Sequence, residues 1–200
     1  MQLPSILATL ALALFGNLAG ADDTASTLAE PATLYNSNGQ SAQWTGVGRL
    51  VSQNKHCIGT LLDSSDAATD PAAPAYVLTA GHCVGGINGK VLVDRPINGS
   101  ISFNYFVDTQ DQRHTVPLKR TIWNSLQGAD LALLELDAKL EELRTLGITP
   151  LKPGPSPAPG SAVLVVGEPS SIGKGLRLST CTERFQGTSS VGSGVAQCQA

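Results

Sequence analysis

The sequence predicts an all-β protein built from short strands. Its 200 residues include 33 glycines and prolines but only 9 aromatic residues, which suits strands joined by tight turns better than long helices. Residues 101–107 alternate between apolar and polar side chains over most of their length, as a half-buried strand does. With 42% hydrophobic and 14% charged residues, the chain can bury one domain of ordinary size or two small ones.

The charge balance argues against two classes of partner. The formal net charge is −3, and 13 lysines and arginines are scattered among 16 acidic residues. Binding to nucleic acid or to an anionic membrane surface needs a basic stripe, which this distribution does not supply. We therefore expect no nucleic-acid partner.

The N-terminus has the pattern of a secretory signal peptide. Residues 1–21 carry no charged side chain, and the apolar run at 6–15 is followed by Ala19-Gly20-Ala21, which fits an A-x-A cleavage site. The apolar run is half as long as the roughly 20 residues that a membrane-spanning helix needs. We expect a secreted or periplasmic protein without a membrane anchor once residues 1–21 are removed, and we read residues 22–43 as a polar leader.

A first β-lobe is expected over residues 44–147. One helix is predicted at its end, over residues 137–146, with Asp137 as N-cap and Gly147 just past the C-terminus. The predicted strands of this lobe are residues 44–51, 57–62, 76–80, 101–107 and 131–136.

A proline-rich connector, residues 148–160, follows the first lobe. Five of the eleven residues 150–160 are proline, which indicates an extended, semi-rigid segment. Strands are predicted again at 161–166 and 176–181. Residues 161–200 are too few to match the first lobe, so we expect only a partial second lobe there.

The four cysteines are interpreted as disulfides, because an exported protein meets an oxidising compartment. Four cysteines allow three pairings. The local solution joins Cys57 to Cys83 and Cys181 to Cys198, and each bridge would then close a short loop.

The competing interpretation is a zinc site built from two His-Cys pairs, His56-Cys57 and His82-Cys83. Adjacent residues on one strand point to opposite faces, and no C-x₂₋₄-C spacing is present. We therefore expect no metal site.

His82 is the first candidate catalytic residue. The apolar strand at 76–80 runs into the small residues Ala80-Gly81, which allow the backbone to turn tightly and to present the imidazole at a strand end. A fixed imidazole is what general-base chemistry needs. The alternative is a surface or structural histidine.

Asp130 is the second candidate. It stands directly before the apolar strand at 131–136, so its carboxylate lies at the edge of a core and needs a hydrogen-bonding partner to stay ionised. An imidazole N–H would be such a partner. The alternative is an aspartate that faces solvent at the start of a strand.

Three motifs resemble those of the trypsin-like (chymotrypsin-fold) serine peptidases: C-x-G-T-L-L at 57–62, L-T-A-G-H-C at 78–83 and D-L-A-L-L-E-L at 130–136. The resemblance covers roughly residues 44–198 and implies two antiparallel β-barrels with the catalytic groups in the cleft between them. It implies peptide-bond hydrolysis through an acyl-enzyme, with His82 as general base and acid, Asp130 orienting it, and Cys57 bridged to Cys83. A polypeptide substrate, no cofactor and a monomer are expected.

The chain departs from that family at the nucleophile. A G-D-S-G-G motif or close variant is expected after Asp130, but the nearest match is Ser193 in V-G-S-G-V, which is better read as part of a glycine- and serine-rich surface loop. The resemblance places the serine just beyond Ala200, with the second barrel incomplete in this chain. The alternative function is a non-catalytic homologue or truncated product that binds a peptide or protein.

Overall fold

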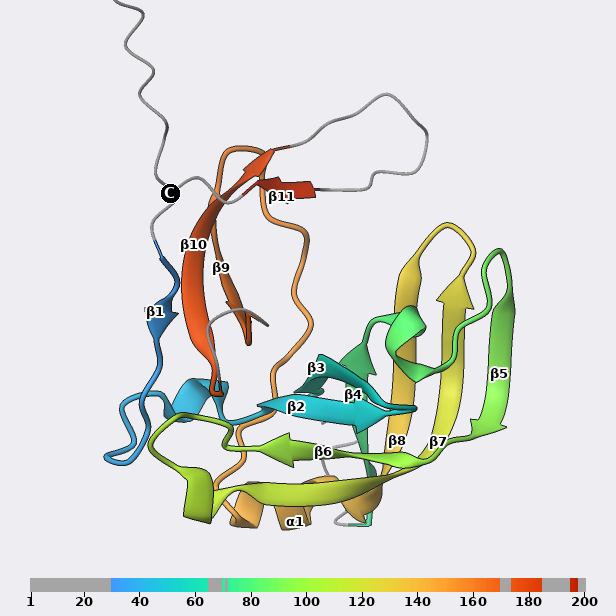
Figure 1. Cartoon of the computed structure of the whole chain (residues 1–200), viewed down its shortest axis with the longest axis horizontal. Helices are drawn as coiled ribbons and strands as arrows, with labels where there is room; N and C mark the ends of the chain where they lie inside the picture. Colours follow the sequence, from blue (N-terminus) through green and yellow to red (C-terminus); the bar gives the residue numbers. More distant parts are fainter. Residues whose placement is uncertain (1–29, 65–69, 71, 170–173, 185–194, 198–200) are drawn as a thin grey trace, which may run out of the picture.

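The computed structural model describes residues 30–64, 70, 72–169, 174–184 and 195–197. Its larger sheet has the strand order β5-β7-β6-β2-β3-β4-β8, and a further pairing of β7 with β8 closes six of these strands into an antiparallel barrel (Figure 1). The strands are β2 (Val47–Ser52), β3 (Lys55–Leu61), β4 (Pro74–Thr79), β5 (Val91–Pro96), β6 (Gly99–Phe103), β7 (His114–Leu126) and β8 (Asp130–Lys139).

A second, smaller sheet stands beside the barrel. β10 (Arg177–Arg184) pairs along one edge with β9 (Ala162–Gly167) and along the other with β1 (Ala32–Thr33) and β11 (Val195–Gln197), always antiparallel. Figure 1 shows this sheet rising at one side of the barrel, reached through the exposed proline-rich segment after residue 151. A barrel plus a partial second sheet confirms the predicted all-β class.

Two apolar clusters hold these parts together. The first fills the barrel and is made of inward-facing residues of its strands, together with Leu140 and Leu143 of the following helix. The second lies between the barrel and the smaller sheet, where Phe106 and Leu176 are fully buried and Val166 of β9 packs against them. Burial of apolar surface is the main force that holds such layers in contact.

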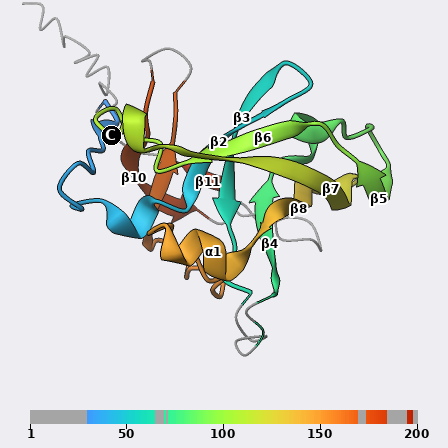
Figure 2. The same ribbon diagram turned by 90° about the horizontal axis from the view of Figure 1, so that it is seen from below.

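The predicted helix is shorter than expected, because Asp137 lies inside β8. Helix α1 covers Leu140–Thr145, and its N-cap is Lys139, whose backbone N–H donates to the Glu142 carboxylate at 3.0 Å. Asp137 belongs to the strand and is not an N-cap, because β8 stays paired with β4 as far as Lys139, which lies opposite Pro74. α1 lies below the barrel, next to β4 and β8 (Figures 1 and 2). The short 3-10 helices are η1 (Ala42–Trp44), η3 (Gly81–Val84) and η4 (Gln110–Gln112).

Several predicted strand limits were wrong for identifiable reasons. The strand expected over 44–51 begins only at Val47, because Trp44 belongs to η1. The strand expected over 101–107 ends at Phe103, because Asn104 adopts a left-handed φ of 51° that breaks the alternation. β5 and β7 were not predicted at all.

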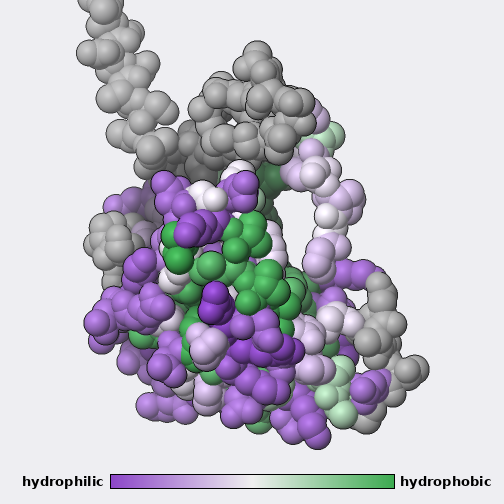
Figure 3. Space-filling view, turned by 90° about the vertical axis from the view of Figure 1, so that its right-hand side faces the viewer, coloured by the Kyte–Doolittle hydropathy of each residue, from purple (hydrophilic) through white to green (hydrophobic). Residues whose placement is uncertain are grey.

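β5 is the edge of the larger sheet, since β7 is its one neighbour among the described strands. Its Val91 and Val93 and the nearby Ile87 are exposed. Figure 3 shows hydrophobic side chains gathered on this side of the molecule within a hydrophilic surround.

Three features proposed from sequence lie outside the described residues: the signal peptide at 1–21, Ser193 and Cys198. The predicted Cys181–Cys198 pairing therefore stays a prediction, although Cys181 itself is buried on β10. In the parts of the chain that are described, no helix is long and apolar enough to cross a membrane.

Candidate active site

A short turn at the end of β4 presents His82. Ala80 is still extended, with φ −75° and ψ 142°, and the 3-10 helix η3 follows at Gly81–Val84. Gly85 ends the turn with φ 79°, a left-handed conformation that glycine adopts without steric cost. His82 is thus the second residue of a tight turn that begins after the extended Ala80 and ends at the left-handed Gly85.

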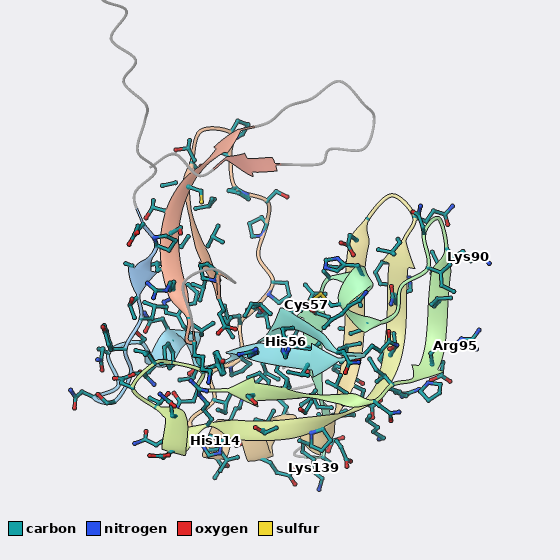
Figure 4. All side chains as sticks on the ribbon, viewed as in Figure 1. His56, Cys57, Lys90, Arg95, His114 and Lys139 are labelled. Atoms are coloured by element: carbon teal, nitrogen blue, oxygen red, sulfur yellow. A yellow bond between two sulfur atoms is a disulfide. The ribbon has the colours of Figure 1, made fainter. Side chains whose placement is uncertain are left out.

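A disulfide joins this turn to the neighbouring strand. Cys57 on β3 is bonded to Cys83 in η3, with their Cα atoms 6.2 Å apart. Cys83 is only 2% exposed, so the bridge lies under the turn, and Figure 4 shows Cys57 on β3 beside η3. The residue that follows His82 is therefore covalently held to the barrel wall.

Strand register brings Asp130 to His82 across 48 residues of sequence. β4 and β8 run antiparallel with Thr79 opposite Ala132, so the start of β8 lies beside the turn that follows Thr79. The Asp130 carboxylate accepts from the His82 backbone N–H at 2.9 Å through Oδ1, and its Oδ2 lies 2.6 Å from His82 Nδ1. One carboxylate thus holds both the backbone and the ring of the histidine.

These contacts also favour the ionised form of Asp130. Hydrogen bonds from the His82 ring and then from its backbone N–H lower the pKa of Asp130 below its usual value, because they favour the charged form. An ionised carboxylate only accepts hydrogen bonds, so Nδ1 must carry the proton that joins them. In the neutral ring, Nε2 then keeps its lone pair and is available as a base.

The pair is open to solvent. The His82 side chain is 57% exposed and that of Asp130 is 47% exposed. The contact that Nε2 makes within the described residues is with Cys83 Sγ at 3.4 Å. Reacting groups can therefore approach the ring from outside.

The metal-site interpretation fails on the chemistry of its donors. Donor atoms of Cys57, His82 and Cys83 lie within 4.8 Å of one another, but both sulfurs belong to the disulfide and neither is a thiolate ligand. His56, the fourth member of the hypothetical zinc set, is turned elsewhere: its Nδ1 lies 3.1 Å from Arg49 Nη2. The four residues do not form a coordination sphere.

Two side chains near the turn were missed by the sequence reasoning. Lys55 donates from Nζ to the His82 backbone oxygen at 2.6 Å, and Asn124 donates from Nδ2 to the Gly81 oxygen at 3.2 Å. Neither belongs to a recognisable motif, so only their position in the fold reveals them.

Comparisons with known proteins bear on the domain family and on the fold. The family model of the trypsin-like peptidase domain matches residues 57–199. The crystal structure of the thermostable serine protease AL20 from an extremophilic microorganism is similar, with a TM-score of 0.52 and 17% sequence identity over 74% of this chain and 70% of that one. At this identity the likeness concerns the fold.

No curated protein sequence matches the chain significantly. The family model nevertheless spans well over half of the chain and includes both the His82 turn and the Asp130 strand. The chain belongs to the family of trypsin-like peptidase domains.

Proposed function

We propose that this protein is a secreted serine endopeptidase that hydrolyses peptide bonds through an acyl-enzyme. The observation that carries the proposal is the His82–Asp130 pair, in which one carboxylate holds both the Nδ1 and the backbone N–H of a histidine next to a disulfide. A histidine oriented by a third group is the arrangement that activates a serine hydroxyl.

The two residues have separate roles in this proposal. His82 Nε2 takes the proton from the attacking hydroxyl and later gives it to the leaving amine. Asp130 keeps the ring in the Nδ1–H tautomer and stabilises the imidazolium that forms, which is consistent with its lowered pKa. We propose that the nucleophile is a serine just beyond Ala200, since a G-D-S-G-G motif or close variant is expected after Asp130 and Ser193 matches it poorly.

The remaining features of the proposal follow from the family and from the N-terminal pattern. The substrate is a polypeptide, because the family is one of peptidases. The signal-peptide pattern of residues 1–21 supports a secreted or periplasmic location. We propose a monomer that acts without a cofactor.

A fluorophosphonate probe tests the proposal, because it reacts covalently with an activated serine. The product of the complete gene should be labelled, and His82→Ala should abolish labelling and reduce kcat by about six orders of magnitude, as removal of a triad histidine does. His114→Ala is the matched control, because it removes a histidine that Figure 4 shows well away from Cys57.

Each outcome separates the candidate functions. Labelling that survives His82→Ala, or a complete gene product that is never labelled, would overturn the catalytic proposal and favour a peptide-binding homologue. Labelling of the chain that ends at Ala200, lost in Ser193→Ala, would instead move the nucleophile to Ser193.

A further inference from the structure

We propose that Asn124 and Lys55 are positioning residues that hold the backbone of the His82 turn in its reactive geometry. The catalytic consequence rests on the proposed function, but the structural role does not. Each side chain donates a hydrogen bond to carbonyl oxygens of η3, from a different strand of the barrel.

Asn124 holds the turn from the inside. It lies on β7 and is only 1% exposed, and its Nδ2 donates to the oxygen of Gly81 at 3.2 Å and to that of Val84 at 3.5 Å. Gly81 and Val84 are the first and last residues of η3. One buried amide therefore spans both ends of the turn, with the longer contact the weaker of the two.

The shape of the turn matches this amide. A Cβ at Gly81 would lie 2.7 Å from Asn124 Oδ1, and one at Gly86 would lie 3.0 Å from the same atom. The amide thus occupies the space that side chains at these two positions would need. Asn124 Oδ1 accepts no hydrogen bond from a described residue, so the bonded contacts of the amide are those of Nδ2.

Lys55 holds the turn from the outside. It is the first residue of β3 and is exposed, and its Nζ donates to the His82 backbone oxygen at 2.6 Å. A bond between an ammonium and a carbonyl is charge-assisted, and such bonds are roughly twice as strong as neutral ones.

The consequence for His82 follows from the number of contacts at one residue. Asp130 bonds its backbone N–H and its ring, Lys55 bonds its backbone oxygen, and Asn124 bonds the oxygen of the residue before it. Loss of the Lys55 or the Asn124 donor removes a side-chain hydrogen bond to a carbonyl oxygen of the turn, while the disulfide stays in place. We infer that the ring then leaves its alignment with Asp130 for part of the time.

The test uses four variants of the purified protein. Lys55→Met removes the donor from an exposed site, and Lys55→Arg restores a donor as the conservative rescue. Asn124→Asp keeps the size of the side chain but turns a donor into an acceptor facing the Gly81 oxygen. Val116→Ala shortens a buried residue of the barrel core and controls for general destabilisation.

The first readout is the ¹⁵N NMR spectrum of the histidine rings, which reports the Nδ1–H tautomer and does not depend on hydrolysis. We expect the His82 Nδ1–H signal to broaden or shift in Lys55→Met and Asn124→Asp and to stay as in the wild type in Lys55→Arg and Val116→Ala. An unchanged signal in both test variants would overturn the inference. If Asn124→Asp does not fold, Lys55→Met alone decides.

The second readout is the kinetics of the complete gene product. We expect kcat to fall by about 10- to 100-fold in the two test variants with KM unchanged, since misplacing a catalytic group by about 1 Å has effects of this size. A change in KM with kcat unchanged would show a role in substrate binding instead and contradict the inference. If the complete product has no activity, the proposed function fails, and the NMR result still decides the positioning role.

Discussion

Removing the Cys57–Cys83 disulfide should destabilise the protein by a calculable amount. The bridge connects β3 to the turn that carries His82 and spans 26 residues of sequence. In the double variant Cys57→Ala/Cys83→Ala, the unfolded chain gains the freedom that the closed loop had denied it.

The magnitude follows from the length of that loop. For a separation of 26 residues, the loop-closure entropy is about 12 cal/mol/K, which corresponds to roughly 3.5 kcal/mol at 25 °C. For a chain of this length, each kcal/mol moves the melting temperature by about 2–4 °C, so a decrease of about 7–14 °C is expected.

Urea denaturation followed by tryptophan fluorescence would measure this loss. Because Cys83 is buried, the double alanine variant also removes packing. The companion variant Cys57→Ala/Cys83→Val keeps side-chain volume at residue 83. Similar losses of unfolding free energy in the two variants would therefore show that the loss comes from opening the loop and not from lost packing. A loss of unfolding free energy below about 1 kcal/mol in both variants would show that the closed loop does not stabilise the protein as calculated.

Three further changes probe the His82 turn, the ion pairs of Glu135 and the barrel core. Gly81→Ala should move the His82 turn and reduce the unfolding free energy by about 1–3 kcal/mol, because the added Cβ would lie 2.5 Å from the Ser125 backbone oxygen. The control is Gly154→Ala, which should leave the melting temperature unchanged because its Cβ would meet no atom within 4 Å. Glu135 is 4% exposed, and hydrogen bonds from a lysine and an arginine lower its pKa, so Glu135→Gln should cost about 1–2 kcal/mol at pH 7. The lowered pKa of Glu135 stabilises the folded protein at pH values above the ordinary carboxyl pKa, and this stabilisation is lost as the pH falls. The difference in unfolding free energy between Glu135→Gln and the wild type should therefore shrink towards about pH 3. A difference that stays constant with pH would show that the ionised carboxylate is not the stabilising group. Phe103→Ala should cost about 3–5 kcal/mol by urea denaturation, since the ring is fully buried in the barrel; a cost below about 1 kcal/mol would show that the core there is not tightly packed.

β7 shows why part of the fold could not be predicted from the sequence. This strand runs for 13 residues but contains Pro117, Lys119 and Arg120, and bulges shift its register against β8 on either side of Arg120. Each shift moves the following side chains to the other face, so no single period of two runs through the segment. Asn124 lies beyond these shifts and could not be assigned to the buried face in advance.

The local parts of the site could be predicted from the amino-acid sequence. An apolar strand leading into Ala80-Gly81 and an aspartate before a second apolar strand specified which residues stand at the strand ends, and the motifs around them pointed to the family. These features depend on neighbours within a few residues, which is why they can be read along the chain.

How those parts come into contact depends on the folded arrangement of the strands. The pairing of β4 with β8 sets the 2.6 Å contact between His82 and Asp130, and the barrel brings Lys55 and Asn124 to the carbonyl oxygens of the same turn. Such contacts depend on register and barrel closure over tens of residues, and no local pattern carries that information.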